Sequence, residues 1–111
     1  MNNQEKLTWY EITVDVIPDI NDKRHNFFYV SVSQWSEWEE FGNMRYNYNP
    51  FVGNYCNRRN FLDHVQDRHA DHIIIADTIM DLDTALKLEE YLVKGFRSDD
   101  EAHGFNQKVG E

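Results

Sequence analysis

The sequence contains a single cysteine, Cys56, and only two prolines and five glycines in 111 residues. One cysteine excludes an internal disulfide and any zinc site built on several thiolates, and it is typical of proteins from a reducing compartment. The longest apolar run, residues 73–76, is far too short to span a bilayer. The first residues, MNNQEKLTWYE, offer no apolar run that could act as a signal peptide. We therefore expect a cytoplasmic protein with no membrane partner.

Basic residues are also scarce. Eleven Lys and Arg stand against twenty Asp and Glu, which gives a formal net charge of −9. Because contacts with phosphates supply most of the non-specific affinity for nucleic acid, this charge argues against a general nucleic-acid binder. It remains compatible with a small active site that holds a few local cations. It also suits an acidic surface that binds a protein or imitates DNA.

Apolar residues, in contrast, are sufficient for a folded core. They make up 41% of the chain, with three Trp, six Tyr and seven Phe. This composition excludes an intrinsically disordered protein. The length predicts a single domain, residues 1–111, with its core from about residue 8 to residue 110.

Alternation with a period of two predicts the strands. Residues 8–16 and 27–33 alternate between apolar and polar side chains, and the turn-rich segment 17–26 between them predicts an antiparallel hairpin. The β-branched run over residues 72–79 predicts a third, central strand.

Three helices complete the predicted fold. Ser36 begins a capping-box motif and predicts a short helix, and residues 58–70 and 82–97 follow helical periodicity. The Asn-rich stretch 43–57 is predicted to be a long loop. The order β-β-α-α-β-α predicts an α+β domain with a three-stranded antiparallel sheet flanked by helices.

Glu89 stands out in the last of these helices. It falls inside the apolar arc, at ~40° from Ala85 on the helical wheel. A carboxylate that points to the core is costly unless it has a partner. Glu89 is therefore either paired with an Arg or capped by backbone donors, or it is a functional acid or metal ligand.

Several segments resemble the GIY-YIG endonucleases of the phage and homing type. Arg45 lies where that family has an Arg after the hairpin, and the other matches follow the family's order along the chain. The segments Thr8-Trp9-Tyr10-Glu11-Ile12-Thr13, Tyr29-Val30-Ser31-Val32-Ser33, Ala85-x-x-Leu88-Glu89 and Gly104-Phe105-Asn106 resemble G-I-Y-x-I-T, Y-I-G-x-T/S, A-x-x-L-E and G-Y-N.

The resemblance implies a GIY-YIG-like domain that hydrolyses DNA phosphodiester bonds with one Mg²⁺ or Mn²⁺. It implies that Glu89 binds the metal and that Tyr10 activates the attacking water. Tyr29 would orient water or phosphate and Arg45 would hold the phosphate, while Asn106 would brace the site. A phage-encoded member would act in the cytoplasm of the host cell.

Binding of DNA would also need local cations outside the reaction centre. The residues predicted to contact DNA are Arg45, Arg58, Arg59, Lys23 and Arg24.

A second reading stays open. The signature glycines are replaced by Thr8 and Ser31, and the net charge is −9. Both features favour a catalytically inactive relative that binds and inhibits a protein partner by acidic DNA mimicry.

Overall fold

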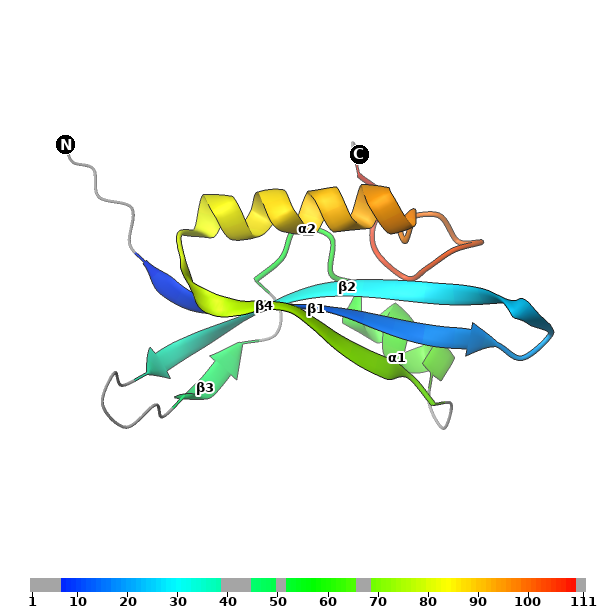
Figure 1. The fold of residues 1–111 in the computed structure, drawn as a ribbon, viewed down its shortest axis with the longest axis horizontal. Helices are drawn as coiled ribbons and strands as arrows, with labels where there is room; N and C mark the ends of the chain where they lie inside the picture. The colour runs from blue at the N-terminus through cyan, green and yellow to red at the C-terminus, as the bar shows by residue number, and fades with distance from the viewer. Residues whose placement is uncertain (1–6, 39–44, 50–51, 66–68, 110–111) are drawn as a thin grey trace.

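The computed structural model describes residues 7–38, 45–49, 52–65 and 69–109. Its four strands form one antiparallel sheet in the order β3-β2-β1-β4. One helix lies along one face of the sheet and the other lies on the opposite side (Figure 1). The elements are β1 (Thr8–Asp19), β2 (Asp22–Trp38), β3 (Arg45–Asn49), α1 (Arg58–Val65), β4 (Asp71–Met80) and α2 (Leu82–Phe96).

The α+β class and the three long antiparallel strands are as predicted. The predicted strands correspond to β1, β2 and β4, and β1 lies between the other two. The central strand is thus β1 and not β4, so the prediction that residues 72–79 form a central strand is wrong. A run of β-branched residues indicates a strand, but it does not distinguish a central position from an edge.

The short helix predicted from Ser36 is also wrong, because β2 continues through Trp38. Trp35 and Trp38 lie opposite Tyr48 and Arg45 of β3, a strand inside the stretch predicted to be a loop. Strand pairing by aromatic residues outweighs the local capping-box signal here.

The connection between the first two strands is tighter than the predicted segment 17–26. Only Ile20 and Asn21 separate β1 from β2. The carboxylate of Asp19 accepts a hydrogen bond from the backbone N–H of Asn21 at 2.9 Å, and that of Asp22 accepts one from Arg24 at 3.0 Å. Such short-range bonds stabilise a turn locally, so both strands extend almost to its tip.

The sheet has a core on each face. On the α2 face, Ile12 and Val32 pack against Ala85, and Val14 and Val30 pack against Val93. On the α1 face, Ile17 and Tyr29 pack with Phe61, Val65 and Phe105, the last from the C-terminal tail. The two faces therefore bury different residues of the same strands, as the period of two requires.

Helix α2 begins and ends as its capping residues dictate. The carboxylate of Asp81 accepts from the N–H of Thr84 at 3.1 Å and so caps the first turn. Arg97 has a left-handed backbone with φ of 58° and ends the helix. Helix α1 is described only to Val65; residues 66–68 of the predicted 58–70 helix lie outside the described residues, and 69–70 are not helical. None of the helices in the described ranges is long and apolar enough to cross a membrane.

Candidate functional site

Glu89 is fully buried on α2, with 0% of its surface exposed, as its place in the apolar arc predicts. Its Oε1 accepts a hydrogen bond from the backbone N–H of Asn54 at 2.8 Å, and its Oε2 accepts one from Tyr55 at 3.0 Å. Burial raises the pKa of Glu89, and the N–H groups of Tyr55 and Asn54 oppose that rise. The side chain is thus capped by backbone donors, one of the outcomes expected for it.

The loop before α1 approaches Glu89 closely. A Cβ at Gly53 would overlap the Glu89 carboxylate, so only glycine fits at this position. The Sγ of Cys56 lies 3.8 Å from Glu89 Oε2, and burial raises the pKa of the Cys56 thiol. Glu89 therefore holds the 53–56 loop against α2.

Asn106 supports the same loop from the other side. Its side chain accepts from the N–H of Val30 at 2.8 Å and donates to the carbonyl of Val30 at 2.7 Å. It also donates to the carbonyl of Tyr55 at 2.9 Å. The tail thus joins the edge of β2 to the loop.

The tyrosines lie on opposite faces of the sheet. Tyr10 belongs to the core on the α2 face, whereas Tyr29 stacks on Phe61 of α1 with ring centroids 4.3 Å apart. Burial raises the pKa of both, and most strongly that of Tyr29. A general base needs a lowered tyrosine pKa, so neither environment favours proton abstraction from water. The hydroxyl of Tyr29 is buried without a hydrogen-bond partner among the described residues.

The predicted DNA contacts are distributed over the sheet. Lys23 and Arg24 are exposed at the tip of the β1–β2 hairpin, and Arg58 and Arg59 are exposed at the start of α1. Arg45 begins β3, at the other end of β2 from that hairpin (Figure 1). These residues thus start from three separate places in the fold, which are the hairpin tip, the start of α1 and the start of β3.

The residues around Glu89 do not fit the implied metal ion. Mg²⁺ prefers oxygen ligands in an octahedral arrangement. Here both carboxylate oxygens accept from backbone amides, and the other nearby side chain is a thiol. Over the described ranges, no three His, Cys, Asp or Glu side chains are arranged to hold a metal ion.

A cavity of about 520 Å³ lies between the β1–β2 hairpin, α1 and the tail. Its lining combines carboxylates, amides and phenyl rings. The residues that line it are Asp19, Ile20, Asn21, Phe27, Asn60, Glu101, Gly104 and Phe105.

Contacts between side chains join the residues on one side of this cavity. His25 Nδ1 lies 3.0 Å from Asp19 Oδ2, and the His25 ring meets Phe27 edge-on with centroids 4.8 Å apart. The rings of Phe27 and Phe105 lie 5.5 Å apart. No sequence pattern predicts this site, because its residues come from four separate segments, which are the β1–β2 turn, β2, α1 and the tail, and only the fold brings them together.

Comparison of the chain with protein-family models, with curated proteins and with solved structures finds no match. The resemblance to the GIY-YIG endonucleases therefore rests on the sequence motifs alone.

Proposed function

We propose that this chain is a non-catalytic domain that binds a basic segment of a partner protein, and that the cavity beside the β1–β2 hairpin receives one of its arginine or lysine side chains. The observation that carries the proposal is the chemistry of the lining. Asp19 and Glu101 supply negative charge, and Phe27 and Phe105 supply aromatic surface. A guanidinium group uses both, through ion pairing and through stacking on rings.

The size and the charge of the molecule agree with this function. A volume of about 520 Å³ lies in the usual range for binding sites, and it exceeds what one side chain fills. A net charge of −9 attracts a basic partner over long range. A few separate charges beside aromatic rings suit the recognition of individual side chains. They suit the imitation of a DNA backbone less well. The single half-buried cysteine suits the reducing cytoplasm, where we propose that the protein acts.

N-acetylarginine amide is the simplest probe of the cavity. In a ¹⁵N–¹H NMR titration we expect saturable shifts at the amides of Asn21, Gly104 and Phe105, with a dissociation constant on the order of millimolar for so small a ligand. Glu101→Gln removes one exposed carboxylate and should weaken binding severalfold. Asp83→Asn makes the same charge change on the outer surface of α2 and should leave binding unchanged. Shifts that are absent, or equal in the two variants, would contradict the proposal.

DNA cleavage is the second candidate function, and one observation favours it. Glu89 and Asn106, which both belong to segments that resemble the endonucleases, bind the same loop at Tyr55. Catalysis would require the loop to release the Glu89 carboxylate. Incubation with supercoiled plasmid and Mg²⁺ at low salt tests this candidate. We expect the parent protein not to cleave the plasmid. If it does cleave, and if Glu89→Gln abolishes that cleavage, the endonuclease function replaces the binding proposal.

A further inference from the structure

Strand β4 exposes three consecutive isoleucines at the edge of the sheet. The exposed fractions are 46% for Ile73, 53% for Ile74 and 42% for Ile75. Because β4 is the last strand in the order β3-β2-β1-β4, its outer edge has no neighbouring strand within the described residues. Edge strands of monomers usually carry charges, prolines or a cover that prevents pairing with another chain. Three exposed isoleucines in a row on an edge strand indicate an interface.

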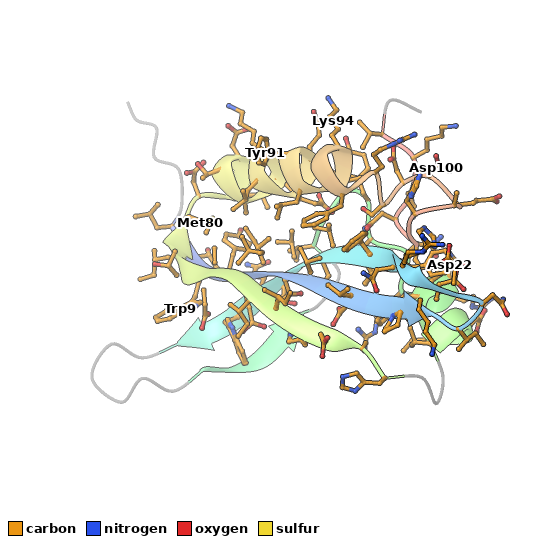
Figure 2. The ribbon with its side chains drawn as sticks, turned by 45° about the vertical axis from the view of Figure 1, so that its right-hand side comes forward. Trp9, Asp22, Met80, Tyr91, Lys94 and Asp100 are labelled. Carbon is orange, nitrogen blue, oxygen red and sulfur yellow. The ribbon has the colours of Figure 1, made fainter. Side chains whose placement is uncertain are left out.

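The position of α2 explains the exposure of Ile73, which pairs with Val14 and lies on the α2 face of the sheet. The helix packs over β2 and β1 and leaves β4 beside it (Figure 1). Tyr91 and Lys94 lie on the outer surface of α2 and point away from the sheet (Figure 2). The helix therefore leaves Ile73 uncovered, and the exposed fractions of Ile74 and Ile75 show that these side chains are also uncovered within the described residues.

A β-bulge decides which side chains of β4 share a face. Along β1, Ile12 pairs with Ala76 and the next residue, Thr13, pairs with Ile74, so Ile75 is an extra residue. His72 and Asp77 consequently lie on the same face, although five positions separate them. In a regular strand they would face opposite sides.

We propose that two copies of the chain pair through β4, antiparallel and about a two-fold axis, to form one continuous sheet. In the register that we infer, His72 of each copy lies opposite Asp77 of the other. Ile73 lies opposite Ala76, and Asp71 lies opposite Thr78. All three pairs match faces, because His72 and Asp77 belong to the α1 face and the other four residues belong to the α2 face.

Charge complementarity favours a second copy as the occupant. The Nδ1 of His72 lies 2.7 Å from Asp15, so in the imidazolium form its Nε2–H is left to donate across the interface to the opposite Asp77 carboxylate, whose Oδ1 also accepts from Trp9 Nε1 at 2.6 Å. The two-fold axis forms this pair twice. Moving the register by two residues one way places Asp77 opposite Ile74, and moving it the other way places Asp71 opposite Ala76. Both shifts lose the His–Asp pairs and bury a carboxylate against an apolar side chain.

Sedimentation velocity over a concentration series tests the dimer. We expect the parent protein to dimerise reversibly, and Ile74→Lys to raise the dimer dissociation constant at least about tenfold, because two ammonium groups meet at the axis. Tyr91 is 73% exposed on α2, so Tyr91→Lys adds the same charge elsewhere and should dimerise like the parent. Thermal unfolding would verify that both variants fold.

Disulfide trapping tests the register. Ile73→Cys and Ala76→Cys, each made in a Cys56→Ala background, should cross-link when the two proteins are mixed under oxidising conditions. Directly opposite Cβ atoms lie within disulfide reach. Each variant alone should cross-link far less. A parent protein that stays monomeric, a dimer that survives Ile74→Lys, or equal trapping in mixed and unmixed samples would overturn the proposal.

Discussion

Glu89 and Asn106 bind the backbone N–H and the backbone carbonyl of the same residue, Tyr55. Glu89 Oε2 accepts from the backbone N–H of Tyr55 at 3.0 Å, and Asn106 Nδ2 donates to the carbonyl of Tyr55 at 2.9 Å. Thirty-four positions separate Glu89 from Tyr55 in sequence, and fifty-one separate Tyr55 from Asn106. The helix, the loop and the tail are thereby fixed to one another and, through Val30, to β2.

Truncation of Glu89 should destabilise the fold. Glu89→Ala leaves the amides of Asn54 and Tyr55 without their acceptor and opens a gap beside α2, so we expect a loss of about 2–3 kcal/mol in the free energy of unfolding. Glu89→Gln keeps the shape and one acceptor and should lose about 1 kcal/mol. Chemical denaturation of both variants provides the measurement. A Glu89→Ala protein as stable as the parent would show that the loop does not depend on the carboxylate.

The stability that Glu89 contributes should depend on pH. Because burial raises its pKa in the folded state, the folded protein binds this proton more tightly than the unfolded chain. The contribution is fully present below the unfolded pKa of about 4.3 and is lost as the pH rises through the raised folded pKa. The free energy of unfolding of the parent, relative to that of Glu89→Gln, should therefore fall as the pH rises from acid to neutral. The opposite change would mean that hydrogen bonds from the Asn54 and Tyr55 amides lower the pKa of Glu89 by more than burial raises it.

Glu89 and Asn106 should be coupled energetically. Asn106→Ala removes three hydrogen bonds and should cost about 2–4 kcal/mol. Once either side chain is lost, the loop at Tyr55 loosens, so the second loss should cost less than it does alone. A double-mutant cycle with both alanine variants should give a coupling energy of about 1 kcal/mol. Strict additivity would show that the two contacts act independently.

The hydroxyl of Tyr29 distinguishes the two candidate functions. It has no hydrogen-bond partner among the described groups, so Tyr29→Phe should change the free energy of unfolding by no more than about 1 kcal/mol and leave arginine binding unaffected. If the chain is an endonuclease, the same substitution should abolish cleavage. Plasmid cleavage and denaturation measured on one preparation compare these outcomes directly.

Two glycines of the C-terminal region should respond to alanine in opposite ways. A Cβ at Gly104 would overlap the carbonyl of Phe28 and the backbone of Ser98, so we expect Gly104→Ala to cost at least about 2 kcal/mol. At Gly95 nothing lies within 4 Å of the added atom. Gly95→Ala should instead stabilise α2 by about 0.5–1 kcal/mol. Thermal unfolding of the pair makes each variant the control for the other.

Much of the fold follows from local patterns. Alternation places Tyr10 and Ile12 on the face that α2 covers, and helical periodicity points Glu89 inward. Asp81 caps α2 as its position before the first turn predicts. These features depend on neighbours within one strand or one helical turn, and such neighbours are visible in a single sequence.

The candidate site needed contacts between distant segments. Tyr10 and Tyr29 occupy matching places in the endonuclease motifs, yet the β1–β2 register pairs Tyr10 with Gln34 and Tyr29 with Asp15. That register sends the two rings to opposite faces, and a change of one residue would have joined them. The cavity at Asp19 and Glu101 likewise exists only where the hairpin, α1 and the tail meet.

Periodicity and capping act over a few residues, so local patterns predict an acidic α+β chain, the faces of its strands and an inward carboxylate on its last helix. Contacts between distant segments bring backbone amides to this carboxylate and leave β4 as an edge with exposed isoleucines. Strand order and register are set by pairing between segments far apart in the chain, and no local pattern encodes them.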